Sequence, residues 1–113
     1  MEELFAKMGE YIRMEDELPL PEFQEYYQSV IDYLMKNYQD MDTDQLIKAK
    51  GITMIVANNA KARAARKDAN RKKFSKMGEK CAFWEGAIKM RLVKEGMSEQ
   101  DINAKVDALW NEA

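Results

Sequence analysis

The sequence has no histidine and only one cysteine, Cys81. The lack of imidazole excludes histidine general bases, Ser-His-Asp and Cys-His nucleophile systems, zinc fingers and haem-attachment motifs. A single cysteine also excludes an intramolecular disulfide, and a lone thiol is typical of a reducing compartment such as the cytoplasm. We therefore expect a cytoplasmic, non-catalytic protein that uses no metal and no cofactor.

Proline and glycine are scarce, and long apolar runs are lacking. Two prolines and five glycines in 113 residues are too few for a β-sandwich or barrel, and an apolar content of 46% is too high for a disordered chain. No window approaches 18 consecutive apolar residues and the first residues do not resemble a signal peptide, so we expect no membrane partner. The length favours a single domain over residues 1–113.

The charge is unevenly distributed, although the net charge is only −2. Residues 1–46 contain twelve acids and three bases, which gives −9. Residues 61–80 contain nine bases and two acids, which gives +7. An acidic first part followed by a basic middle is the strongest feature of the sequence, and it points to electrostatic contacts within the chain or with a partner.

The apolar residues of the first half have the spacing of amphipathic helices. They recur at intervals of three and four over residues 4–12, and again over residues 23–38. Pro19 and Pro21 separate the two segments, because proline disfavours helix at the residue before it. Pro21 itself suits the first turn of the second helix.

Capping residues mark the remaining helix boundaries. Asp42 followed by Gln45 is a capping-box pattern, which predicts the start of a third helix. The apolar run over residues 52–56 has a composition that would also suit a buried strand, but the cap favours helix. Gly96 suits the end of a helix, and Ser98 suits the start of the last one.

The apolar and small residues between positions 47 and 92 form two stripes on a helical projection. The first stripe consists of Ile47, Gly51, Met54, Asn58, Ala62, Ala65 and Ala69. The second, centred about 130° away, consists of Phe74, Met77, Cys81, Trp84, Ile88 and Leu92. Either the chain breaks near residues 68–73 into a compact hairpin, or one rod of ~80 Å presents two faces and requires oligomerisation.

These patterns predict an all-α fold of four or five helices, a helical bundle with a long central helix or a helical hairpin. Because the chain supplies only a modest core, and a long helix would need covering, we also expect a homo-oligomer. The predicted core consists of Phe23, Tyr27, Val30, Leu34, Ile47, Met54, Ile55, Phe74, Met77, Trp84, Ile88, Ile102, Leu109 and Trp110.

The basic segment 61–80 is the main functional candidate, because its bases point in almost every direction around a helix. Like charges at this density repel one another, and nearby anions relieve that repulsion. Three sources of anions fit: phosphate groups of a nucleic acid or nucleotide, an acidic surface of another protein, and the acidic first part of this chain. The predicted phosphate- or acidic-partner-binding residues are Arg63, Arg66, Lys67, Arg71, Lys72, Lys73 and Lys76.

Other polar patterns are weaker candidates. Tyr33 lies off the main apolar face of its helix and among acids, so we predict an exposed protein-contact residue. The D-x-D-x-D sequence over residues 40–44 lacks the Gly and Glu that a calcium loop needs at later positions. Glu22, Glu25 and Asp32 have a spacing that suits magnesium, but a solvated helix face explains them more simply.

Two functions remain open after these exclusions. The first is a non-catalytic helical binding protein of the interaction or inhibitor type, which occupies a charged surface of a protein or ribonucleoprotein partner. The alternative is a nucleic-acid or nucleotide binder that acts through phosphate contacts of the basic segment. A magnesium-dependent enzyme built on the acidic helices is the weakest hypothesis.

Overall fold

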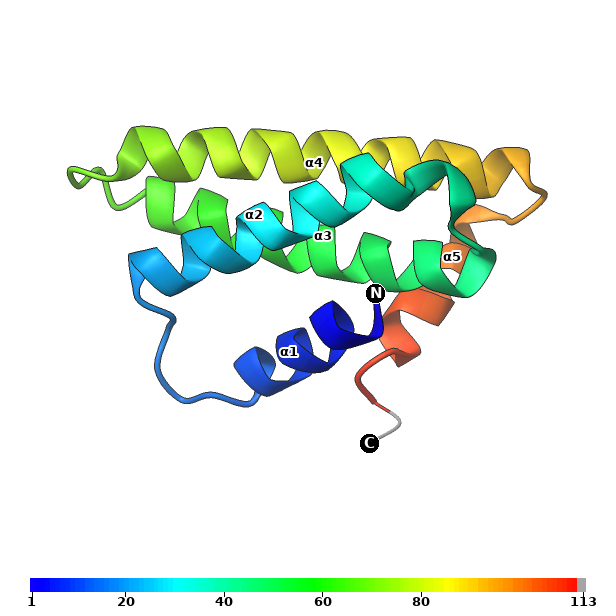
Figure 1. Cartoon of the computed structure of the whole chain (residues 1–113), viewed down its shortest axis with the longest axis horizontal. Helices are drawn as coiled ribbons and strands as arrows, with labels where there is room; N and C mark the ends of the chain where they lie inside the picture. Colours follow the sequence, from blue (N-terminus) through cyan, green and yellow to red (C-terminus); the bar gives the residue numbers. More distant parts are fainter. Residues whose placement is uncertain (112–113) are drawn as a thin grey trace.

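The chain folds into α-helices connected by short turns, as the sequence predicts. A computed structural model describes residues 1–111, and within them it contains five α-helices, one 3-10 helix and no strand. The elements are α1 (Glu2–Ile12), α2 (Leu20–Asn37), η1 (Tyr38–Asp40), α3 (Thr43–Ala64), α4 (Arg71–Lys94) and α5 (Glu99–Ala108). Figure 1 shows α3 and α4 as a long antiparallel pair, with α2 crossing them and α1 and α5 on the side away from α4.

The long apolar segment is a helical hairpin and not a single rod. Helix α3 ends at Ala64, and α4 begins at Arg71 after a turn in which Lys67 has a φ of +56°. The second stripe lies in the core, but the first stripe does not face it. Gly51 lies against Leu109 and Trp110, and the stripe residues from position 58 onward are exposed. At Gly78 an added Cβ would lie 3.3 Å from Lys61 Cγ and 3.5 Å from Ala60 Cβ. Glycine at this position therefore lets α4 pack closely against α3. The radius of gyration is 13.9 Å, close to the ~13 Å of a compact chain of this length.

The predicted helix boundaries are confirmed by their hydrogen bonds. The Asp42 carboxylate accepts from the backbone N–H of Gln45, and the Gln45 side chain accepts from the backbone N–H of Asp42. The Ser98 hydroxyl accepts from the backbone N–H of Asp101 at the start of α5. Gly96 has a φ of +106°, which few residues other than glycine adopt without strain.

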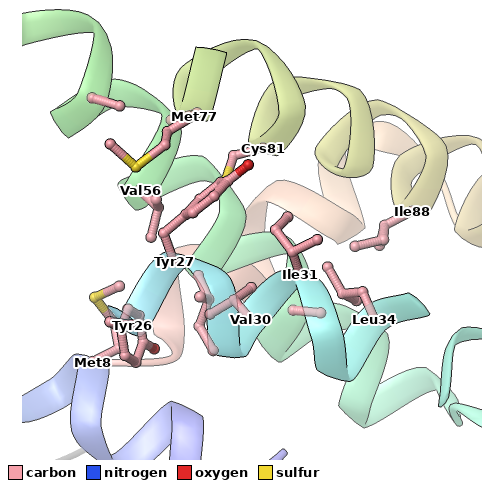
Figure 2. Close-up of a cluster of buried hydrophobic side chains, with 14 of the residues drawn as sticks. Met8, Tyr26, Tyr27, Val30, Ile31, Leu34, Val56, Met77, Cys81 and Ile88 are labelled. Carbon is pink, nitrogen blue, oxygen red and sulfur yellow. The ribbon is translucent and has the colours of Figure 1, made fainter. Parts of the chain in front are cut away.

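The core lies where α2 covers the α3–α4 hairpin. Figure 2 shows Val30, Ile31 and Leu34 of α2 pointing between the two long helices, with Ile88 of α4 beside them. The predicted core residues that are buried are Phe23, Tyr27, Val30, Leu34, Ile47, Phe74, Met77, Ile88 and Ile102. The remaining ones are half-buried and pack against the core: Met54, Ile55, Trp84, Leu109 and Trp110.

Cys81 lies in this core as a fully buried side chain. Burial raises the pKa of its thiol to about 12, with a smaller contribution from the nearby Glu85 carboxylate. The thiol is therefore protonated at neutral pH and is a packing group, because the thiolate is the reactive form of cysteine.

Contacts from several elements hold α1 and the end of α5 against α3. The Tyr26 hydroxyl donates a 2.6 Å hydrogen bond to the carbonyl of Leu4, and Phe5 stacks on Trp110 with ring centroids 5.4 Å apart. Trp110 also lies over Gly51 of α3, where a Cβ would come within 2.9 Å of the indole. Gly51 is thus the position at which the last helix approaches α3. No helix within residues 1–111 is both long and apolar enough to cross a membrane.

Candidate polyanion-binding surface

Five of the predicted binding residues lie together on the surface at one end of the hairpin. Lys67 belongs to the turn, and the other four belong to the first two turns of α4. All five are exposed, and within residues 1–111 none of them forms an ion pair. We call this surface the basic tip, and it consists of Lys67, Arg71, Lys72, Lys73 and Lys76.

The local backbone explains why these cations lie so close together. The Asp68 carboxylate accepts from the backbone N–H of Asn70, and the carbonyl of Asp68 accepts from the backbone N–H of Arg71, so the turn is tight. On α4, Phe74 and Met77 face the core, whereas the basic residues of the first two turns, Arg71, Lys72, Lys73 and Lys76, are exposed. Lys72 and Lys76 lie one helical turn apart and share the outward side.

The start of α4 is electrostatically unfavourable without an external anion. Asn70 makes no side-chain capping bond, and the first turn contains no acid and three bases. A helix N-terminus carries partial positive charge on its free N–H groups, which favours anions and disfavours cations. The basic tip therefore combines the positive charge of side chains with the partial positive charge of the helix N-terminus. A bound anion would reduce the electrostatic repulsion from both sources.

The structure corrects the prediction for Arg63, because this residue is buried and does not belong to an exposed surface. It is only 4% exposed, and its guanidinium lies 4.4 Å from the ring centroid of Phe23 and 5.5 Å from that of Phe74. Its Nε donates to the Asn59 side chain at 2.8 Å. Burial is the main cause that lowers the pKa of Arg63, and the Glu17 carboxylate, 3.8 Å from Nε, opposes that shift. Arg63 thus joins α2, α3 and α4.

Arg66 is exposed but is already paired within the chain. Its two terminal nitrogens donate to the two oxygens of Glu17, each at 2.7 Å. This bidentate hydrogen bond is the main cause that lowers the pKa of Glu17 and raises the pKa of Arg66. Arg66 therefore lies beside the basic tip as a cation whose charge is neutralised by the α1–α2 loop.

The acidic first part of the chain neutralises little of the basic middle. Within residues 1–111, Glu17 is the one acid that forms ion pairs with bases of segment 61–80. Other acids of the first part are exposed on α1 and α2, where Glu3, Glu22 and Glu25 line a shallow depression together with Lys7. The molecule therefore has a basic end on α4 and an acidic face on α1 and α2.

Tyr33 is not an exposed side chain, in contrast to the prediction. The side chain is half-buried and packs against the core, since α2 turns this position partly toward its neighbours. A role in protein contact stays a prediction for Tyr33. No group of three or more His, Cys, Asp or Glu side chains that could hold a metal ion occurs among the residues that the structure describes.

Two other bases have structural partners that the sequence did not indicate. Arg91 donates to the carbonyls of Tyr38 and Met41, and it thereby fixes η1 against α4. Lys50 is buried in α3 and pairs with Glu85 of α4 at 3.3 Å. These partners are remote in sequence, so no local pattern reveals them.

The candidate site is therefore a set of exposed cations at one end of the α3–α4 hairpin. No protein-family model, no curated protein and no solved structure matches this chain.

Proposed function

We propose that this chain is a non-catalytic binding protein whose basic tip contacts the phosphate backbone of a nucleic acid, free or within a ribonucleoprotein. The single observation that carries the proposal is the set of five exposed cations without ion-pair partners in residues 1–111. Phosphate oxygens would supply the missing countercharge, and release of condensed counterions from the nucleic acid would drive binding.

The chemistry of the tip favours contact with the backbone over recognition of bases. Lysine ammonium groups bind phosphate as point charges, and Arg71 adds one guanidinium. No aromatic side chain is part of the basic tip, so stacking on single-stranded bases has no support. We therefore expect binding that depends little on nucleotide sequence.

The acidic face of α1 and α2 restricts the path of such a ligand. A phosphate chain would be repelled by Glu22 and Glu25 on α2, and it would be attracted by Lys72 and Lys76 on α4. The ligand is therefore expected to pass over the turn and along α4, and to avoid the opposite side of the molecule.

The test is fluorescence anisotropy with a labelled 20-base-pair duplex at several salt concentrations. With about four to five phosphate contacts, the logarithm of the association constant should fall against log[salt] with a slope of about −4, so affinity drops by about two orders of magnitude between 50 and 200 mM. The double variant Lys72→Glu/Lys76→Glu should lose at least about tenfold in affinity and show a shallower slope.

The matched control is Lys36→Glu/Lys105→Glu, which makes the same change in net charge at exposed positions far from the tip. It should retain the slope and most of the affinity, while circular dichroism verifies that both double variants remain helical. Equal losses in the two double variants would show a net-charge effect and contradict the proposal. Binding without salt dependence would also contradict it.

An acidic surface of a partner protein is the second candidate ligand, as in an interaction or inhibitor protein. The observation that favours it is that the molecule has an acidic face on α1 and α2 as well as the basic tip, because a protein partner can offer both signs of charge and a nucleic acid cannot. A polyglutamate peptide of matched charge distinguishes the two ligands. Binding of the peptide with equal or higher affinity than the duplex would favour the protein partner.

A further inference from the structure

One side of α4 exposes large apolar side chains to solvent. Phe83 is 68% exposed, Met90 is 69% exposed and Val93 is 46% exposed. Between them lies Gly86, where an added Cβ would meet no atom within 4 Å. Glu79 and Lys94 lie at the two ends of this strip, and both are exposed. We call the strip the outer face of α4, and it consists of Glu79, Phe83, Gly86, Met90, Val93 and Lys94.

The spacing of the outer face is that of a helix-packing seam. Positions 79, 83, 86, 90 and 93 follow steps of four, three, four and three, which is the 3.5-residue repeat of a coiled coil. The opposite side of α4, with Cys81 and Ile88, is already buried in the core. In Figure 1, α4 runs along the upper edge of the molecule with α2 and α3 below it, so the outer face is open.

We propose that the outer face of α4 binds the same face of a second copy, with the two α4 helices antiparallel. Charge complementarity selects the second copy and the direction. In a parallel pair the basic tips would lie side by side and repel. In an antiparallel pair the tips lie at opposite ends, and each approaches the end of the other copy's α4. There Glu95 and Glu99 already pair with Arg91 and Lys89, and Asp101 forms no ion pair within residues 1–111.

One register pairs Phe83 with Met90 and Glu79 with Lys94, while it places Val93 opposite Lys80. With Gly86 of one copy opposite Ala87 of the other, Phe83 faces Met90, which allows a sulfur–aromatic contact. The same register brings Glu79 opposite Lys94, and neither forms an ion pair within residues 1–111 of its own chain. Two-fold symmetry repeats each pair, and the small residues at the centre let the backbones approach closely.

The outer face and the basic tip share no residue, although both lie on α4, so each proposal is tested with its own variant: Phe83→Ser/Met90→Ser for self-association and Lys72→Glu/Lys76→Glu for nucleic-acid binding. The first experiment is sedimentation velocity on nuclease-treated protein from about 5 to 300 µM, since an interface of one helix face associates weakly. We expect a concentration-dependent monomer–dimer equilibrium. The variant Phe83→Ser/Met90→Ser should raise the dissociation constant at least about tenfold, because both side chains lose apolar burial in the dimer.

A charge-exchange cycle tests the antiparallel register. Glu79→Lys and Lys94→Glu each place like charges opposite one another and should weaken the dimer several-fold, whereas the double variant Glu79→Lys/Lys94→Glu should restore it. The matched control is Glu25→Lys, which makes the same charge change as Glu79→Lys on the exposed side of α2 and should leave the dissociation constant unchanged.

Three results would overturn the proposal. The first is a monomer at every concentration, and the second is a dimer that is insensitive to Phe83→Ser/Met90→Ser. The third is a double charge variant that dimerises no better than the single ones. A monomer that instead sediments with vesicles of anionic lipid, and loses this with Phe83→Ser/Met90→Ser, would assign the face to a lipid surface and also refute the second-copy proposal.

Discussion

At the scale of single residues, neighbouring arginines of the basic segment have opposite roles. Arg63 is buried between Phe23 and Phe74, whereas Arg66 is exposed and pairs with Glu17. Both were predicted as partner-binding residues, because the sequence shows charge and spacing but not which base a neighbouring helix covers. Phe23 and Phe74 come from α2 and α4, so the aromatic site for Arg63 exists only in the folded chain.

We predict that Arg63→Ala and Arg66→Ala have very different effects on stability. Arg63→Ala should lower the free energy of unfolding by about 2–4 kcal/mol, because it removes buried packing and a cation–π contact between three helices. Arg66→Ala should cost at most about 1 kcal/mol, as is usual for exposed ion pairs. Urea denaturation followed by circular dichroism measures both, and equal costs would show that Arg63 is not a structural residue.

At the scale of elements, the helix boundaries were predictable and the packing between helices was not. Asp42 and Ser98 find their hydrogen-bond partners three residues away, so the local sequence contains the whole cap. The change of direction of the apolar stripes indicated a break near residues 68–73, and the turn between α3 and α4 lies at residues 65–70. The turn uses Lys67 at a positive φ, and no glycine marks it.

Two glycines in the middle of helices provide a prediction at this scale. At Gly51 an added Cβ would lie 2.8 Å from Leu109 Cδ1, so Gly51→Ala should lower the free energy of unfolding by about 1–3 kcal/mol. At Gly86 the space is open, so Gly86→Ala should raise it by about 1 kcal/mol through helix propensity. Thermal and urea unfolding of dilute protein measures both, and a stabilised Gly51→Ala would refute the close packing of α5 on α3.

At the scale of the whole molecule, the separation of charge was predictable but its pairing was not. The sequence predicts an acidic first part and a basic middle, and both exist as exposed surfaces in the fold. Their mutual neutralisation was one open alternative, and the structure reduces it to the contacts of Glu17 with Arg63 and Arg66. The topology decides this outcome, because α2 approaches the hairpin with its apolar side and turns its acids outward.

Glu17 connects acidity to the stability of the loop before α2. Its pKa is lowered in the folded state, mainly by the hydrogen bond from Arg66, so the unfolded chain binds the proton more readily. The stabilisation is therefore complete above the unfolded pKa and is lost as the pH falls through the folded value. The difference in melting temperature between the native protein and Glu17→Gln should be largest near neutral pH and should shrink as the pH falls below the pKa of Glu17 in the unfolded chain.

The same variant has a consequence for the proposed ligand. Glu17→Gln removes one negative charge and releases Arg66 beside the basic tip, so it should raise affinity for the duplex by about threefold at low salt. Anisotropy under the conditions given above measures the change, and Glu25→Gln on α2 is the matched control. A weaker affinity for Glu17→Gln than for the control would show that the loop orders the binding surface and does not compete with it.

The stack of Phe5 on Trp110 joins two segments from opposite ends of the chain. Helix α1 is short and rests on this stack, on the Tyr26–Leu4 hydrogen bond and on an exposed ion pair between Glu2 and Lys48. When one of the two segments detaches, the other loses part of its apolar cover. We therefore expect α1 and α5 to unfold locally as one cooperative unit, so that in hydrogen–deuterium exchange their amide hydrogens exchange together and ahead of those in the hairpin.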